Sequence, residues 1–134
     1  MKRRKFFSLT LFSFIFTTFL PIFHKVFAQE TENNFYKLGS LTDLEENGFL
    51  LNENLEIGAV LVILKEDNSL IAIEPTCTHM GCLVEWNKQE NLFICPCHNS
   101  KFQEDGKVVE GLAISDLPIY QVKIENNTVF VANQ

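Results

Sequence analysis

Short apolar segments separated by polar turns fill the chain from residue 35 to its end. Residues 59–64 form a continuous apolar run, which predicts a buried strand, and residues 120–124 alternate between apolar and polar, which predicts a half-buried strand. Further strands are expected at 35–38, 49–51, 70–73, 83–86, 92–94, 108–109 and 128–131. Only residues 40–46 favour a helical turn, with Thr42 and Glu45 at capping-box spacing. Many short strands joined by polar turns predict an all-β fold, an antiparallel sandwich or a small barrel.

The segment before this region has a different pattern. Residues 6–23 are apolar for 18 residues, the lower end of the length that spans a bilayer, and predict one N-terminal apolar helix. Arg3 and Arg4 precede the run, as in a twin-arginine export signal. We therefore expect a signal or anchor segment at 1–28 and a polar linker at 29–34. An ordinary export signal or a plain membrane anchor is the alternative.

The fate of the leader has two readings. Val26-Phe27-Ala28 is similar to a signal-peptide cleavage site, and cleavage near Ala28 would release a soluble periplasmic protein. We favour a retained membrane anchor. Basic residues ahead of the apolar run place its N-terminus in the cytoplasm, so the following domain lies on the periplasmic or lumenal side.

Charge is divided unevenly between the two parts of the chain. Residues 1–28 hold five basic and no acidic residues, whereas the rest holds six basic and seventeen acidic residues, a net charge of −11. An acidic domain lacks the basic patch that neutralises phosphates, so we exclude nucleic acid as a partner.

All four cysteines and two of the three histidines lie between residues 77 and 98. They occupy two short segments, Cys77-Thr78-His79-Met80-Gly81-Cys82 and Cys95-Pro96-Cys97-His98-Asn99-Ser100. Each segment supplies a sulfur and a nitrogen close together, which suits an iron–sulfur centre with two Cys on one iron and two His on the other. We expect Gly81 to remove a Cβ where the backbone passes close to that centre, and Pro96 to fix one φ.

Two simpler sites use some of the same residues. A Cys₂His₂ zinc site has the same ligand types, but zinc fingers usually pair Cys with Cys and His with His. Two disulfides would use all four cysteines of an exported chain, yet they leave both histidines unexplained. A hairpin formed by 83–86 and 92–94 would hold the two segments together, with Trp86 packed in the core beneath them.

The two segments resemble the motif C-x-H-x-G-C … C-x-x-H of the Rieske [2Fe-2S] family. The resemblance implies that Cys77 and Cys95 ligate one iron and that His79 and His98 ligate the other. It also implies a disulfide between Cys82 and Cys97, as in Rieske proteins of cytochrome bc complexes. By the same resemblance, residues 35–134 form the Rieske domain, with a cluster-binding subdomain at about 75–101.

The resemblance extends to residues around the ligands, with three departures. Ser100 matches a family serine that donates a hydrogen bond to a bridging sulfide. Phe102 replaces a tyrosine that bonds a cysteine sulfur in high-potential members, so we expect a lower potential here. Asn99 replaces a glycine, and Asn tolerates the left-handed backbone that this turn would need. Residues 111–113, Gly-Leu-Ala, stand where the family has a Gly-Pro-Ala loop over the cluster.

The implied function is electron transfer of the bc or b6f type. The chain would accept an electron and a proton from quinol, with His98 as the quinol contact, and pass the electron to a c-type cytochrome or similar acceptor. Met80 and Leu83 would form an apolar rim for docking on a cytochrome b-type membrane subunit. The sequence offers no substrate pocket of its own, so we expect a redox subunit of an oxidoreductase assembly and not a stand-alone enzyme.

Two other Rieske classes remain as alternatives. The first is the small subunit of a periplasmic molybdenum oxidoreductase such as arsenite oxidase, which resembles this chain in its leader and its cluster motif. The second is the ferredoxin-like Rieske protein of dioxygenase systems, which normally lacks the second cysteine pair and the export leader. Short alternative Rieske subunits of cyanobacteria offer the nearest analogy to the chain as a whole.

Overall fold

The computed structural model describes residues 34–134, so the predicted leader, its apolar helix and the linker up to residue 33 lie outside the described residues. Within residues 34–134, no helix has the length and apolarity needed to cross a membrane. The helix in this part is α1 (Leu41–Asn47). The strands are β1 (Tyr36–Ser40), β2 (Phe49–Leu55), β3 (Gly58–Leu64), β4 (Leu70–Ile73), β5 (Glu85–Asn87), β6 (Leu92–Ile94), β7 (Lys101–Gln103), β8 (Val108–Glu110), β9 (Ile119–Glu125) and β10 (Thr128–Ala132).

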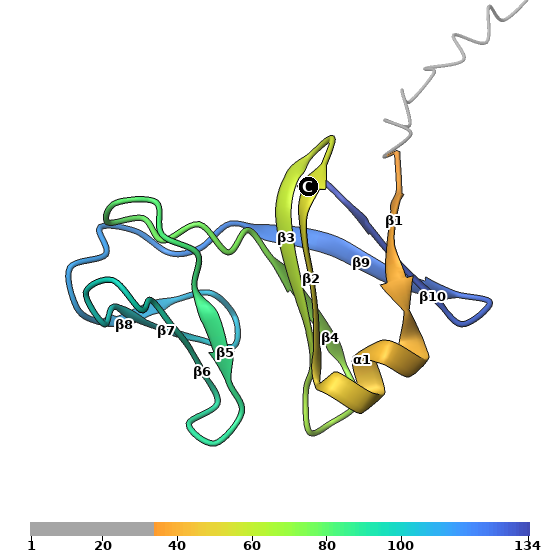
Figure 1. Ribbon diagram of the computed structural model, residues 1–134, viewed down its shortest axis with the longest axis horizontal. Coiled ribbons are helices and arrows are strands. Elements are labelled where there is room, and N and C mark those ends of the chain that lie inside the picture. The colour runs from red at the N-terminus through yellow and green to blue at the C-terminus, as the bar shows by residue number, and fades with distance from the viewer. Residues whose placement is uncertain (1–33) are drawn as a thin grey trace, which may run out of the picture. The chain divides into compact units, whose positions relative to one another are not determined.

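Six strands form an antiparallel base sheet in the order β1-β10-β9-β4-β3-β2. Its two edge strands, β1 and β2, contact each other, so the sheet curves almost into a barrel (Figure 1). The apolar run on β3 is buried on both faces. Val60 and Val62 pack inside the curved sheet with Leu44 of α1, whereas Leu61 and Ile63 belong to a second core on the other face. The predicted all-β fold is thus confirmed. Of the two expected arrangements, a sandwich and a small barrel, the base sheet is closer to the barrel.

Helix α1 begins earlier than its predicted capping box. Ser40, and not Thr42, is the N-cap, and its hydroxyl accepts a hydrogen bond from the Asp43 N–H at 3.0 Å. Gly48 ends the helix with a φ of 80°, and its N–H donates to the Leu44 carbonyl. Leu44 then packs in the interior of the base sheet, and the Leu41 N–H donates to the Asn127 carbonyl, so both contacts hold this short helix in place.

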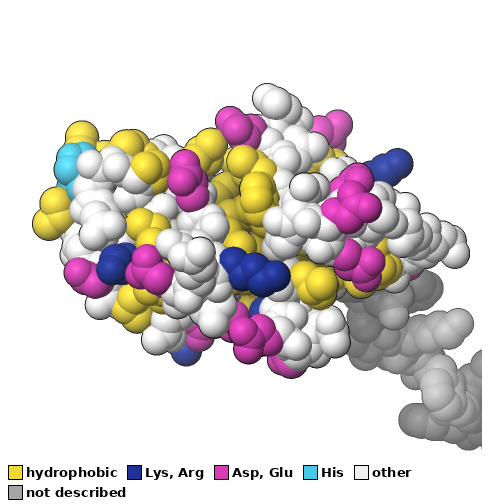
Figure 2. Space-filling model, turned by 60° about the horizontal axis from the view of Figure 1, so that its bottom comes forward, with side chains coloured by type: hydrophobic (Ala, Val, Ile, Leu, Met, Phe, Trp, Pro, Cys, Tyr) yellow, Lys and Arg dark blue, Asp and Glu magenta, His cyan; other side chains and the backbone are white. Residues whose placement is uncertain are grey.

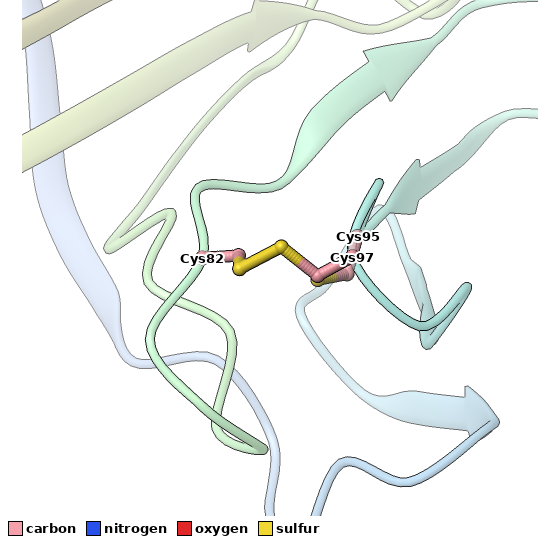
Figure 3. Close-up of side chains that lie close together, drawn as sticks. All are labelled: Cys82, Cys95 and Cys97. Atoms are coloured by element: carbon pink, nitrogen blue, oxygen red, sulfur yellow. A yellow bond between two sulfur atoms is a disulfide. The ribbon is translucent and has the colours of Figure 1, made fainter.

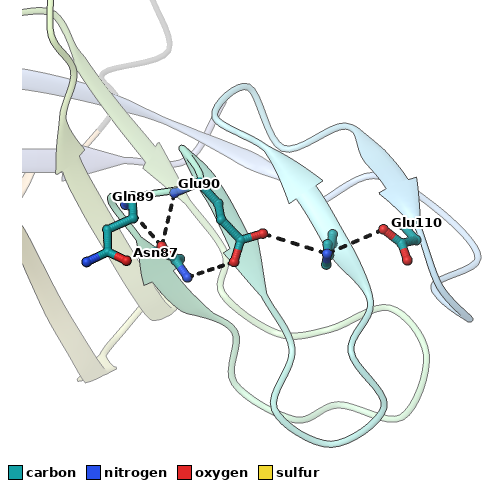
Figure 4. A network of polar contacts seen from close by, with 5 residues as sticks. Asn87, Gln89, Glu90 and Glu110 are labelled. Carbon is teal, nitrogen blue, oxygen red and sulfur yellow. Dashed lines mark hydrogen bonds and ion pairs between the residues drawn. The ribbon is translucent and has the colours of Figure 1, made fainter.

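The four remaining strands form a second sheet in the order β5-β6-β7-β8. Strand β7 was not predicted, because Lys101-Phe102-Gln103 has a single apolar residue. The Lys101 ammonium lies 3.7 Å from the Glu90 carboxylate and 3.5 Å from the Glu110 carboxylate, so it joins the β5–β6 turn to β8 across the sheet (Figure 4). The side chain of Asn87 orders that turn by accepting the N–H groups of Gln89 and Glu90.

The second sheet and its loops, residues 75–117, form a small unit inserted between β4 and β9. The chain leaves and re-enters the base sheet at one point, where the Glu74 N–H donates to the Pro118 carbonyl at 2.8 Å. Leu61, Ile63 and Ile73 of the base sheet share one buried core with residues of the small unit, namely Cys77, Val84, Phe93, Cys95, Phe102 and Leu117. The small unit is therefore packed onto the base sheet and not merely tethered to it.

Candidate iron–sulfur site

The two cysteine–histidine segments form loops with the same hydrogen-bond pattern. In each loop the first Cys donates its N–H to the carbonyl five residues later at 2.8 Å. The residue four positions after that Cys donates its N–H back to the Cys carbonyl at 2.9 Å. The residues are Cys77, Gly81 and Cys82 in the first loop, and Cys95, Asn99 and Ser100 in the second. Each loop thus presents its Cys and His from one compact turn.

This turn requires a left-handed backbone at its fifth residue. Gly81 has a φ of 81° and Asn99 a φ of 61°, so the expectation that Asn99 tolerates this geometry is confirmed. The backbone angle gives one reason for glycine at residue 81, because among protein atoms a Cβ there would meet a Thr76 methyl group at 4.0 Å. That Gly81 also makes room for the cluster stays a prediction.

The four cysteines divide into a disulfide and two free thiols. Cys82 and Cys97 are bonded to each other with their Cα atoms 6.5 Å apart, which joins the two loops (Figure 3). Cys77 and Cys95 are free and buried. The sulfurs of Cys82, Cys95 and Cys97 lie within 4.8 Å of one another, but two of them are consumed by the disulfide, so Cys95 alone of these three can ligate a metal.

The two histidines stand next to each other at the ends of the loops. The ring centroids of His79 and His98 lie 4.7 Å apart, with the rings at 78°. Nδ1 of His79 is buried and has no hydrogen-bond partner, which is costly for a polar atom unless it binds a metal. His98 is exposed. Two free thiols and a buried, unpartnered imidazole nitrogen are a donor set that fits a [2Fe-2S] centre with mixed ligands.

The environment of Cys77 affects how such a centre would bind. Burial raises the pKa of the Cys77 thiol, and hydrogen bonds from the His79 backbone and the Ser100 side chain act in the opposite direction. A cluster binds cysteine as thiolate, so the Cys77 thiol must lose its proton when the cluster is inserted. Cluster loading therefore releases protons to solvent.

A third segment, residues 111–116, crosses both loops and is called the strap below. Ser100 is fully buried, and its hydroxyl oxygen accepts the N–H groups of Leu112 at 3.1 Å and Ala113 at 3.0 Å. Both acceptor positions of this oxygen are then used, which leaves its proton free for the cysteine side of the site. At the other loop, the Thr78 hydroxyl donates to the Ser115 carbonyl. The role expected for Ser100, a hydrogen bond donated to a bridging sulfide, stays a prediction. Sequence reasoning missed Thr78 and Ser115, whose pairing has no signal in the sequence.

Exposed apolar side chains lie on the first loop and on the strap. Met80, Leu112 and Ile114 are 72%, 58% and 84% exposed. The prediction of Met80 as a rim residue is consistent with this exposure, but Leu83 is half-buried, and its backbone pairs with Thr76. Figure 2 shows a histidine at one end of the molecule beside hydrophobic side chains. Residues 76–84, 92–100 and 111–115 contain no Asp, Glu, Lys or Arg, so both loops and most of the strap are uncharged on an acidic domain.

Two aromatic residues lie beneath the loops. Phe102 is fully buried in the core that contains Cys77 and Cys95. Trp86 is partly buried against the same core, with its ring centroid 4.9 Å from that of Phe93. Both are therefore packing residues, as expected for Trp86.

Residues 34–121 match the family model described as Rieske [2Fe-2S] domain. A cytochrome b6-f complex iron-sulfur subunit of Synechococcus sp. (strain RCC307) is 37% identical over 105 residues, which cover 77% of this chain and 59% of that protein. The corresponding subunit of Chlorobaculum tepidum is 38% identical over 54% of this chain and 40% of its own length. The chain thus spans about half the length of these curated relatives. Their names favour a relationship to b6-f Rieske subunits over the alternative of a molybdenum oxidoreductase subunit.

Solved structures agree with this assignment. The cyanobacterial plasma membrane Rieske protein PetC3 from Synechocystis PCC 6803 matches with a TM-score of 0.66 and 39% identity, over 72% of this chain and 97% of that one. The ferredoxin of carbazole 1,9a-dioxygenase from Nocardioides aromaticivorans, at 17% identity and a TM-score of 0.63, shares the fold. The chain therefore belongs to the Rieske [2Fe-2S] domain family and carries one such cluster.

Proposed function

We propose that this protein is a Rieske electron carrier of the bc or b6f type, which takes one electron and one proton from quinol. It then passes the electron to a c-type cytochrome or a similar acceptor. The observation that supports this most strongly is that His98 is exposed and that the uncharged loops and strap also expose the apolar side chains Met80, Leu112 and Ile114. The relatives named as cytochrome b6-f subunits point in the same direction.

The ligand set is Cys77, His79, Cys95 and His98. Once bound, the cluster supplies one-electron chemistry at a relatively high potential, because two neutral imidazoles replace two thiolates. The exposed ring of His98 is the part of the ligand set that a quinol can reach. Its outer nitrogen would accept the quinol proton, so that proton and electron leave the donor together.

The apolar rim defines the kind of partner. Met80, Leu112 and Ile114 would bury their side chains against a membrane-embedded cytochrome b-type subunit that holds the quinol. Such a contact removes apolar surface from water without desolvating any charge, which favours association. The predicted twin-arginine leader, a retained anchor and a periplasmic or lumenal position are compatible with this assembly and belong to the same proposal.

We expect a midpoint potential below that of high-potential family members. Phe102 lies in the core beside Cys77 and Cys95, and its ring has no hydroxyl to donate to a cysteine sulfur. Phe102→Tyr should raise the potential by about 20–60 mV, the equivalent of one ordinary hydrogen bond for a one-electron couple. Phe102→Leu is the control and should give no rise. A redox titration monitored by EPR at several pH values measures both variants.

The same titration tests the cluster itself. We expect a reduced signal with a mean g below 2 and a potential that falls as pH rises through the deprotonation of the ligand histidines. Absence of an iron signal, with zinc bound instead, would overturn the electron-transfer function altogether.

Docking and quinol reaction need a separate test. The chain is added to a cytochrome b6-f preparation that has been depleted of its own iron-sulfur subunit, and quinol oxidation is followed. Met80→Lys places a charge in the rim and should slow the reaction strongly while the potential stays unchanged, whereas Met80→Leu should retain it. No activity with the unaltered chain would remove quinol as the donor but leave the cluster assignment intact.

A further inference from the structure

The strap is attached to the two loops in different ways. Toward the second loop, two backbone N–H groups of the strap bond one buried side chain, Ser100. Toward the first loop, the strap is attached to Thr78, whose hydroxyl donates to the Ser115 carbonyl at 2.7 Å and accepts the Ser115 N–H at 3.3 Å. Thr78 lies between the ligands Cys77 and His79, so it joins the strap directly to the ligand-bearing backbone.

Both hydrogen-bonding functions of the Thr78 hydroxyl are used by the strap. The hydroxyl has one proton, which goes to the Ser115 carbonyl, and its oxygen accepts the Ser115 amide. It has no proton left for a cluster sulfur or a ligand. Any effect of Thr78 on the cluster must therefore act through the position of the strap.

We propose that Thr78 is a positioning residue of the cluster site, which holds the strap closed over the first loop. Without its hydroxyl, the strap would keep its hydrogen bonds to Ser100 and the bond from the Val108 N–H to the Asp116 carboxylate. The stretch between these attachments, which carries Ile114 and Ser115, could lift. Ile114 is 84% exposed and Ser115 is exposed, so their own packing provides little to hold them. Lifting would admit water and chelators to the His79 side of the site and would disorder part of the apolar rim.

The test uses the full chain with its cluster. Thr78→Val keeps the shape of the side chain and removes the hydroxyl, and Thr78→Ser keeps the hydroxyl and removes the methyl group. Hydrogen exchange of the peptide covering residues 111–116, followed by mass spectrometry, measures strap opening. The decay of visible cluster absorption in the presence of an iron chelator measures access to the site.

For Thr78→Val we expect amide exchange in the strap and cluster loss to accelerate about tenfold, the factor given by one hydrogen bond of ordinary strength. The EPR signal should broaden as well, because the ligand loop then samples more than one position. Thr78→Ser should restore all three properties. If Thr78→Val cannot be loaded with a cluster, Thr78→Ser alone tests the proposal. It must take up the cluster normally, and amide hydrogen exchange in its strap must match that of the unaltered protein.

Two variants act as matched controls. Thr76→Val makes the same chemical change two positions earlier, at a residue that takes no part in the hydrogen bonds between Thr78 and Ser115. Ser115→Ala removes a side chain at a residue that bonds Thr78 only through its backbone. Both should behave like the unaltered protein.

Unchanged strap exchange in Thr78→Val, failure of Thr78→Ser to restore it, or an equal effect of Thr76→Val would each overturn the proposal. The inference rests on the cluster and not on the choice of electron donor. A protein that fails to react with quinol but responds to Thr78→Val as described would therefore contradict the proposed function alone.

Discussion

At the scale of single residues, Asn99 has the backbone angle that most side chains avoid, with a φ of 61°. Asn99→Ala should destabilise the protein by about 1 kcal/mol, because alanine in this region brings its Cβ too close to the following carbonyl. The thermal midpoint should fall by about 4–8 °C for a domain of this size. Thermal unfolding of the cluster-loaded protein followed by circular dichroism measures the shift.

Asn99→Gly is the matched variant, because glycine adopts this angle without a steric penalty. Its midpoint should stay close to that of the unaltered protein. A fall as large as that of Asn99→Ala would mean that the Asn side chain, and not the backbone angle, stabilises the second loop.

The residue scale was also where sequence reasoning was most successful. Cys and His side chains are rare and their spacing in the two loops is specific, so the chain's resemblance to a known family could be found from the sequence. The disulfide between Cys82 and Cys97 that the resemblance implied is confirmed, and the implied ligand set stays a prediction. The contact of Thr78 could not be predicted, because a threonine hydroxyl has many possible partners and Ser115 lies 37 residues away. The exposure of Ile114 likewise depends on the path of the strap and not on local sequence.

At the scale of elements, the strap lies so close to the second loop that a glycine is required between them. A Cβ on Gly111 would lie 2.5 Å from the Ser100 Cα and 2.8 Å from its hydroxyl oxygen. Gly111→Ala should therefore displace the strap, remove the two hydrogen bonds to Ser100 and shorten the lifetime of the cluster. The expected cost is about 1–2 kcal/mol for the backbone angle and a further 1–3 kcal/mol for overpacking.

Gly48→Ala separates these two contributions. Gly48 also has a positive φ, of 80°, but a Cβ there meets nothing within 4 Å. It should show the backbone cost alone and leave cluster lifetime unchanged. Equal effects of the two variants on thermal stability and on cluster absorption would contradict the close packing of strap and loop.

The elements themselves were predictable where their own residues decide their conformation. The apolar run of β3 and the alternation of β9 both indicated strands, and both are found. Strand β7 could not be predicted, because it exists through pairing with β6 and β8 and not through its own composition. Strand β5 begins later than predicted, since the backbone of Leu83 pairs instead with Thr76, just before the first loop.

At the scale of the whole described domain, the small unit and the base sheet share one core. Two antiparallel chain segments connect them, one leaving β4 and one entering β9. These segments each contain a proline, Pro75 and Pro118, and are joined by the Glu74–Pro118 hydrogen bond. Proline restricts the backbone in both segments. We therefore expect residues 34–134 to move as one body.

Tyr120 should make the domain less stable at alkaline pH. Its ring is buried in the base sheet core, and its hydroxyl donates to the Ile57 carbonyl at 3.1 Å. Burial, with a further contribution from the Glu74 carboxylate, raises the pKa of Tyr120 above its usual value of 10.0. The folded protein then holds this proton more tightly than the unfolded chain. The stabilisation is fully present below about pH 10 and is lost as pH rises from there through the folded-state pKa.

Tyr120→Phe should be less stable at pH 8 by about 1 kcal/mol, because the hydrogen bond to Ile57 is lost. The difference between the two proteins should shrink above pH 10, since phenylalanine has no proton to lose. Thermal midpoints of both proteins at pH 8 and pH 11, at one scan rate, measure this. Parallel losses of stability in the two proteins would show that Tyr120 does not control the alkaline limit.

The insertion of the small unit between β4 and β9 also bears on the order in which the domain can fold. Ala72 pairs with Tyr120, and Ile73 pairs with Ile119, so every residue of both loops lies within the segment that these pairs must close. Closing a long flexible segment costs conformational entropy, and contacts between residues far apart in the chain slow folding. Cluster ligation and the Cys82–Cys97 bond both shorten the free length of this segment. We therefore expect the metal site to act as a folding nucleus for a sheet whose strands contribute none of its ligands.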